Sequence, residues 1–300
     1  MKIKTKMVRG MIPQVRLDCE NSRKLALALN SFPLVIPIYD LICNDTGKPN
    51  QLFKKIKDCG GLHNFLNYSG TIILSSIMRD DLIKKIKLPE EYAEIIKGSK
   101  PNFYFTPDGL TYENKDEDSL KEIIRLSKLT LKLKELCPEI QPIGLVKGSN
   151  YLQIKAHKNF LKKLGVKVFA FHTGDFFRNG DEKRIQTAKY YCSLIKEEGN
   201  LLMLYGLGSP KRMLEFSFAD FFITYTHFVT ARNGNIFEGS KKINYSNMSV
   251  YEAAIYNFKE LSNHLKKLQY QTKLFIGGEC KWAVGQQEQQ YIIQSLKVKA

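Results

Sequence analysis

The sequence predicts an α/β fold, a (β/α)8 TIM-type barrel with additions at its N- and C-termini, and three observations support this. From residue 141 onward, short apolar segments of strand length alternate with amphipathic segments of helix length. The chain has 300 residues, an ordinary length for one such barrel. Hydrophobic residues make up 43% of it, which is enough to fill a large core.

The elements of the C-terminal half follow one another with little ambiguity. Four apolar segments indicate buried parallel strands, at residues 141–147, 166–171, 201–205 and 221–225. Helices are expected at residues 152–164 and 181–198, and a short helix is expected after Ser209 and Pro210, a favoured cap and first-turn pair. Gly165 and Gly199 follow the first two helices, where glycine suits a left-handed C-cap.

The same alternation continues less regularly toward the N-terminus. Strands are expected at residues 34–41, 71–74 and 102–105, and a helix with an apolar face is expected at residues 118–136. With about seven strands, most of them followed by a helix, a closed barrel fits better than an open sheet. Residues 1–30 and 235–300 are interpreted as additions outside the barrel, within a single domain that spans residues 1–300.

The chain is strongly basic, since 46 Lys and Arg residues against 30 Asp and Glu residues give a net charge of +16. Such an excess either keeps the surface solvated or attracts phosphates. On the second interpretation we expect it on the barrel face that bears the mouth. No apolar run approaches the ~18 residues of a membrane span, and no secretory segment follows the basic start. The sequence therefore predicts a cytoplasmic protein without membrane contact.

The six cysteines are too dispersed for a metal or redox motif, because none lies within three residues of another. The five histidines show no ligand spacing with them. We therefore expect reduced thiols, no bound metal and no other cofactor.

Small and polar residues follow nearly every predicted strand, at the end where barrel proteins place their chemistry. They are simply loop residues on the plainer interpretation, with Asp108 in a Pro-Asp-Gly turn and His172 hydrogen-bonded without a chemical role. Taken together, these positions favour a pocket at the barrel mouth. The candidate lining residues are Ser75, Asp108, Lys147, Gly148, His172, Gly174 and Gly206.

Four segments resemble the tRNA-guanine transglycosylase family, in the right order along the chain. Gly60-Gly-Leu-His-Asn-Phe is similar to the family's Gly-Gly-x-His-x-Phe segment, and Ile143-Gly-Leu-Val-Lys-Gly-Ser is similar to its Gly-Ile-Val-Gln-Gly-Gly strand. Tyr205-Gly-Leu-Gly-Ser-Pro matches a Gly-Val-Gly-x-Pro turn, and Thr230-Ala-Arg-Asn-Gly resembles a Thr-Arg-Asn-Ala-Arg loop.

The resemblance covers about residues 55–240. It implies a barrel that exchanges guanine in nucleic acid for a 7-deazaguanine. The segment Phe105-Thr-Pro-Asp is closer to the branch of the family that acts on DNA.

The family's chemistry uses one carboxylate as a nucleophile at C1′ of the nucleoside and another to move protons. The resemblance puts Ser75 at the proton-handling position and Ile223 at the position of the nucleophile, and neither side chain can do that work. Asp220, three residues before Ile223, remains the candidate catalytic residue if the loop that follows is longer than aligned.

Base recognition is better preserved in this resemblance than catalysis. Asp108 falls where the family has an aspartate that accepts hydrogen bonds from N1 and the amino group of guanine. Lys147 replaces a glutamine that reads the other edge of the base, and the family's zinc motif does not follow Gly239. Nucleic-acid contacts are expected around a hairpin that turns at Asn233-Gly234, from Arg232, Lys241 and Lys242.

Three hypotheses follow for the function. In the first, the barrel binds or acts on guanine or a 7-deazaguanine in tRNA or DNA, has lost base exchange, and works as a partner subunit or with altered chemistry. In the second, it is an active, divergent transglycosylase that uses Asp220. In the third, it is a small-molecule barrel enzyme unrelated to nucleic acid. The partners expected from the resemblance are nucleic acid, a 7-deazaguanine-type base, and a homo- or heterodimer with another subunit of the family.

Overall fold

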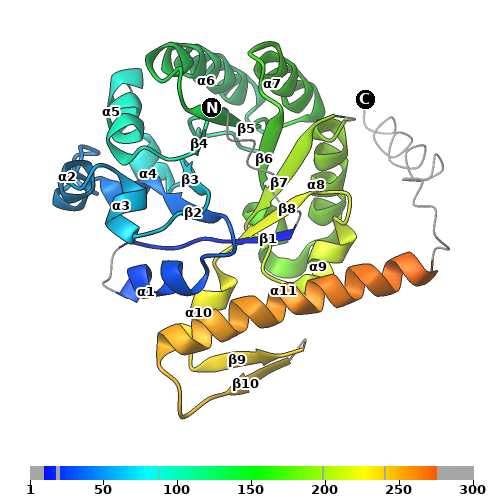
Figure 1. The fold of residues 1–300 in the computed structure, drawn as a ribbon. Coiled ribbons are helices and arrows are strands. Elements are labelled where there is room, and N and C mark those ends of the chain that lie inside the picture. The colour runs from blue at the N-terminus through cyan, green and yellow to red at the C-terminus, as the bar shows by residue number, and fades with distance from the viewer. Residues whose placement is uncertain (1–9, 18–20, 87, 198, 240, 276–300) are drawn as a thin grey trace.

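A computed structural model describes residues 10–17, 21–86, 88–197, 199–239 and 241–275 (Figure 1). Within these residues, eight parallel strands form one sheet in the order β1-β8-β7-β6-β5-β4-β3-β2, surrounded by helices. The predicted (β/α)8 barrel is confirmed. The strands are β1 Gly10–Pro13, β2 Leu34–Pro37, β3 Ile72–Ser75, β4 Phe103–Phe105, β5 Gln141–Leu145, β6 Val168–His172, β7 Leu201–Tyr205 and β8 Phe221–Thr224.

The barrel closes between β1 and β2. Gln14 forms a parallel bridge with Val35 of β2, and the amide of Val15 donates to the carbonyl of Val35 at 2.9 Å. On its other side β1 pairs with β8. The expectation that residues 1–30 lie outside the barrel is therefore wrong for Gly10–Pro13. A four-residue strand with glycine at one end and proline at the other carries too little periodicity to be recognised.

The helices lie around the strands and return the chain from the end of one strand to the start of the next (Figure 1). Side-chain caps begin several of them: Asn150 accepts from the Gln153 amide at 3.1 Å before α7, and Asp181 accepts from the Lys183 amide at 3.0 Å before α8. Gly165 follows α7 with φ +83°, the left-handed conformation that the sequence predicts there. The helices that follow strands β2 to β8 are α2 Gln51–Asp58, α3 Leu62–Leu66, α4 Asp80–Ile83, α5 Pro89–Ser99, α6 Asp116–Leu136, α7 Tyr151–Lys163, α8 Glu182–Ile195, α9 Pro210–Glu215 and α10 Thr226–Arg232.

The hydrophobic core has two parts, as the barrel architecture requires. The larger part lies between the strands and the helices. The smaller part fills the barrel interior, with Phe105, Met203, Phe221 and Ile223 among its largest side chains. Because the interior is packed, a ligand can bind only above it or below it, at an end of the barrel.

The chain continues after β8 and α10 into a hairpin and a long helix. Strands β9 Asn235–Glu238 and β10 Lys241–Asn244 pair antiparallel, with Lys241 opposite Glu238. The turn predicted at Asn233-Gly234 is wrong, because Gly234 links α10 to β9 and the chain reverses after Glu238. Helix α11 Val250–Phe275 packs against α9, α10 and α1 Asn21–Ala28 outside the barrel. None of the helices in the described part of the chain is long and apolar enough to cross a membrane.

Candidate functional site

The C-terminal ends of the strands surround a cavity of about 1120 Å³. This is the end of the barrel at which barrel proteins hold their ligands. Its volume slightly exceeds the range of about 300–1,000 Å³ usual for small-molecule sites, so it has room for more than a single base. At least one residue at or after the end of each strand lines it, in the order β1 to β8: Gln14, Tyr39, Asp80, Tyr112, Lys147, His172, Tyr205 and Tyr225.

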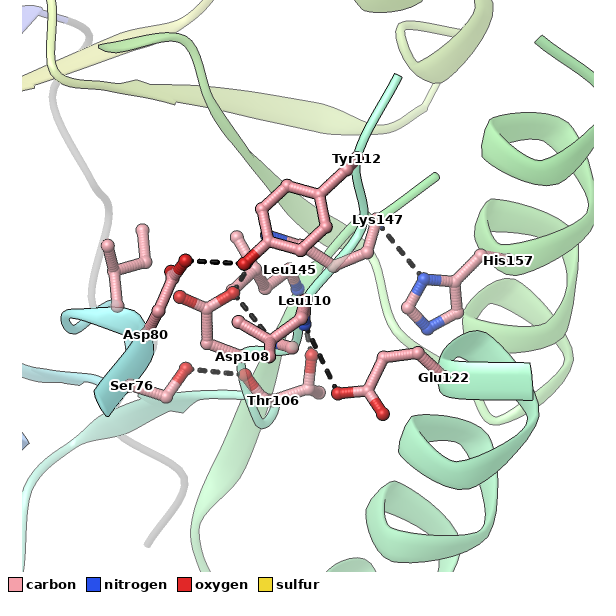
Figure 2. A network of polar contacts seen from close by, with 12 residues as sticks. Ser76, Asp80, Thr106, Asp108, Leu110, Tyr112, Glu122, Leu145, Lys147 and His157 are labelled. Carbon is pink, nitrogen blue, oxygen red and sulfur yellow. Dashed lines mark hydrogen bonds and ion pairs between the residues drawn. The ribbon is translucent and has the colours of Figure 1, made fainter. Parts of the chain in front are cut away.

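One wall of the cavity holds an ion pair between Asp108, which follows β4, and Lys147, which follows β5 (Figure 2). Lys147 Nζ lies 2.9 Å from Asp108 Oδ1, and the two side chains are 15% and 5% exposed. The amide of Gly109 donates to the same oxygen at 2.8 Å. The amide of Lys147 donates to His157 Nδ1 at 3.0 Å, which fixes the backbone that carries the lysine. The two predicted base-binding residues therefore meet, but only Lys147 lines the cavity, and Asp108 lies behind it.

A tyrosine surrounded by carboxylates lies beside this pair. Tyr112 Oη donates a hydrogen bond to the carboxylate of Asp80, as Figure 2 shows. This hydrogen bond, with desolvation and the negative charges of Asp80, Asp175 and Asp108, raises the pKa of Tyr112 to about 12. The phenol therefore stays protonated at neutral pH, and because its proton is donated to Asp80, its oxygen can accept a hydrogen bond from a ligand.

The floor of the cavity is a hydrogen-bonded layer that the sequence analysis does not identify. Tyr205 Oη donates to Gln14 Oε1 at 2.5 Å, and Gln14 Nε2 donates to Tyr39 Oη at 3.2 Å. Ser75 is fully buried, and its Oγ accepts from the amide of Ile77 at 3.2 Å. Ser75 therefore supports the floor and does not face the cavity.

The connections after β1 and β2 supply a second ion pair. Arg16 Nε lies 2.6 Å from Asp40 Oδ1, and the guanidinium lies 4.6 Å above the centre of the Tyr39 ring. Asp40 Oδ2 accepts from the amide of Leu17 at 2.7 Å, so the buried carboxylate is held on both oxygens. Sequence reasoning missed these residues because the strand that precedes Arg16 was not recognised.

A side pocket of about 250 Å³ adjoins the cavity, and both are lined by Gln14, Tyr205 and Tyr225. It contains the predicted Gly206, with Ile223 of β8 and Lys242 of β10. The hairpin thus reaches the mouth, as expected from the sequence. Arg232 and Lys241 line neither cavity and are exposed.

Three further predicted residues take different positions at the mouth. His172 lines the cavity, and its ring meets that of Tyr205 edge to face at 5.7 Å. Gly148 also lines it. Gly174 begins the 3-10 helix η2 Gly174–Gly180 and lies beneath His172, where an added Cβ would come 2.9 Å from the His172 Nε2. Phe177, which follows His172 in the chain and lies on η2, packs against Phe216.

Asp220 lies at the opposite end of the barrel, directly before β8. Its Oδ2 is 2.6 Å from Lys196 Nζ and accepts from the amide of Leu202 at 2.8 Å. It lines neither of the two cavities described above. The hypothesis that Asp220 attacks a ligand at the mouth is contradicted by this position, because the carboxylate instead fixes the start of β7 beside β8.

The charges of the cavity lining are balanced. Its basic members are Arg16, Arg79, Lys147 and Arg184, and its acidic members are Asp40, Asp80, Glu113 and Asp175. Ion pairs join Arg16 to Asp40 and Arg184 to Glu113, the latter at 3.8 Å. The positive excess of the chain is therefore not located in this lining.

No protein-family model matches the chain, and no curated protein matches it either. The described residues hold no group of three or more His, Cys, Asp or Glu side chains arranged for a metal ion. What the site can do follows from its own chemistry. A cation next to a carboxylate, a phenol oxygen that can accept, and the aromatic side chains of Tyr39, Phe176 and Tyr225 in the lining suit a planar, polar ligand.

Proposed function

We propose that this chain is a divergent transglycosylase-like barrel protein that binds guanine or a 7-deazaguanine of nucleic acid in the mouth cavity. The observation that carries the proposal is the ion pair of Asp108 and Lys147 in the cavity wall. A carboxylate beside an ammonium offers an acceptor next to a donor, which is what one edge of a guanine requires.

A guanine-type base would make three kinds of contact in the cavity. Asp108 accepts hydrogen bonds from the amino side of the base, and Lys147 donates to its carbonyl oxygen. The base must then share or open the ion pair, which costs little when its own groups replace the partners lost. The aromatic side chains of the cavity lining, among them Tyr39 and Tyr225, can contact a planar ring.

Base exchange by the family's two aspartates has no support in the residues of this chain. Ser75 is buried below the cavity floor, Ile223 is aliphatic, and Asp220 lies at the far end of the barrel. We therefore assign the protein a binding role, as a partner subunit of another enzyme or with chemistry different from that of the family. Incubation with radiolabelled guanine and bulk tRNA or DNA tests this assignment, and incorporation by the isolated chain would contradict it.

Calorimetric titration with 7-deazaguanine tests the binding itself. We expect saturable binding by the wild type and none by Asp108→Asn, because the amide presents a donor where the base needs an acceptor. Asp58→Asn is the matched control, since Asp58 is exposed at the end of α2 and should leave binding unchanged. Retention of full affinity in Asp108→Asn would remove the proposed recognition pair.

A second candidate, a barrel enzyme for small polar molecules, is favoured by the balanced charge of the cavity lining. A nucleic-acid strand usually meets a strongly positive surface at its binding site. Binding of tRNA or DNA that weakens with added salt distinguishes the first candidate from this one, because a small-molecule enzyme has no such dependence on phosphate contacts.

A further inference from the structure

Lys147 combines a cavity, partial burial and a neighbouring group that can accept its proton. It lines a large cavity, its side chain is only 15% exposed, and its Nζ lies 2.9 Å from the carboxylate of Asp108. The chain also contains a similar pair without a cavity. Lys196 is 24% exposed and lies 2.6 Å from Asp220 at the other end of the barrel, where neither described cavity reaches.

We propose that Lys147 forms an imine with the carbonyl carbon of a small aldehyde or ketone bound in the mouth cavity. This activity goes beyond base binding. Lysine amines attack carbonyl carbons in this way wherever a neighbouring group takes up the ammonium proton.

The step balances with the groups present. The Lys147 ammonium gives one proton to Asp108, and the free amine forms a C–N bond while the carbonyl π bond breaks. The nitrogen loses a proton as the oxygen gains one, which gives a neutral carbinolamine. Asp108 then returns its proton to the carbinolamine hydroxyl, the C–O bond breaks, and water leaves. The sum is an ammonium and a carbonyl converted to an iminium and water, with Asp108 again a carboxylate.

The surroundings of Lys147 favour this reaction over a purely structural ion pair. Asp108 is 5% exposed and held by the Gly109 amide, so the proton acceptor keeps its position when the lysine moves. Tyr112 Oη, whose proton is donated to Asp80, is an acceptor in the same cavity for a hydroxyl group of the ligand. Partial exclusion of water also protects an iminium from immediate hydrolysis.

Reductive trapping tests the proposal on the full-length protein. The chain is incubated with glyoxylate or glycolaldehyde, reduced with sodium borohydride, digested with chymotrypsin, and mapped by mass spectrometry. With at least one of the two compounds we expect alkylation of Lys147 to exceed that of Lys196 about tenfold, because only Lys147 meets a bound carbonyl beside its acceptor. The Lys147→Arg variant keeps a cation beside Asp108 but cannot form an imine, so it should show only the background seen at exposed lysines.

Equal labelling of Lys147 and Lys196 with both compounds would overturn the proposal, as would undiminished trapping in Asp108→Asn. The result is independent of base binding. Trapping without 7-deazaguanine binding would leave this inference standing and defeat the proposed function, whereas binding without trapping would do the reverse.

Discussion

Asp220 is a buried carboxylate with a structural role. It accepts from Lys196 and from the Leu202 amide, with its side chain 2% exposed. Replacing it with alanine leaves two donors without their partner, so Asp220→Ala should lower the free energy of unfolding by about 2 kcal/mol. Urea denaturation measures this loss, and titration with 7-deazaguanine should show unchanged affinity. If the variant has normal stability and no longer binds the base, Asp220 belongs to the binding site.

Two buried histidines should make the protein sensitive to acid. Burial lowers the pKa of His227 to about 3 and is the main cause that lowers that of His157 to about 4, from an ordinary value of 6.5. Both are neutral in the folded chain, whereas the unfolded chain binds protons once the pH falls below about 6.5. The contribution of these two neutral histidines to the free energy of unfolding is therefore fully present above that pH, and it is lost as the pH falls toward 4.

The variant His227→Phe isolates one of these contributions. Neither ring nitrogen of His227 has a hydrogen-bond partner among the residues that the structure describes, and the ring packs against Phe258 with 5.3 Å between the ring centres. A phenyl ring keeps this contact and cannot be protonated, so the variant should lose less stability between pH 6.5 and 4 than the wild type. Thermal unfolding across that range measures the difference. An equal decline in both proteins would show that His227 does not titrate on unfolding.

At the scale of the elements, the sequence pattern was most informative where a strand is a pure apolar run between polar ends. Residues 201–205 and 221–225 were predicted as strands, and they match β7 and β8 to within one residue. Residues 34–41 were predicted as one strand, but β2 ends at Pro37 and a 3-10 turn, η1 Ile38–Leu41, follows. Proline has no amide hydrogen to continue the ladder.

These errors at strand ends explain what was missed in the site. A barrel mouth is made of the residues that come directly after each strand, so a residue is found only when the end of its strand is known. Lys147 and His172 were identified because the predicted strands at residues 141–147 and 166–171 end within two residues of the ends of β5 and β6. Tyr39 and Asp40 were hidden inside the overlong second strand, and Arg16 was hidden by the unrecognised first one.

The connection after β7 offers a test of how tightly the mouth is assembled. Gly206 has φ +100°, and a Cβ there would lie 3.1 Å from the Gly174 amide nitrogen. Gly206→Ala should therefore cost about 1 kcal/mol of strain and also displace the connection that carries His172. Gly199→Ala is the matched control: Gly199 has φ +81°, and an added Cβ would meet no atom of the described residues within 4 Å, its chain neighbours apart. Both variants should lose stability in urea denaturation, and only Gly206→Ala should lose affinity for 7-deazaguanine. Equal affinities would show that the mouth tolerates the added atom.

At the scale of the whole molecule, charge is separated along the barrel axis. Each helix of the barrel runs back from the mouth, so first turns lie toward the mouth and last turns toward the opposite end. The first turn of α6 is acidic, at Asp116, Glu117 and Asp118, and the last turns of α2 and α7 are basic, at Lys55 and Lys57 and at Lys162 and Lys163. This pattern complements the helix dipoles. It runs against the expectation that the positive excess gathers at the mouth.

Nucleic acid that reaches the mouth should accordingly meet few cations. The basic residues expected to contact it there are Arg232 of α10 with Lys241 and Lys242 of β10, and Lys242 lines the side pocket. Each phosphate contact to a single strand makes binding more sensitive to salt. With three contacts, a plot of the logarithm of the binding constant against the logarithm of the salt concentration should have a slope of about −2. Replacing all three residues with glutamine should abolish the dependence, as filter binding at graded salt concentrations would show.

The matched control for this prediction is the double variant Lys55→Gln and Lys57→Gln, which removes the same kind of charge from the last turn of α2. It should leave both affinity and slope unchanged if the strand binds at the mouth. A slope steeper than about −5 that the control weakens would mean that a single strand is held by about seven or more phosphate contacts. In that case the strand would lie on the basic end of the barrel, too far from Asp108 and Lys147 to present a base to them, and the mouth cavity would be left to a small-molecule ligand.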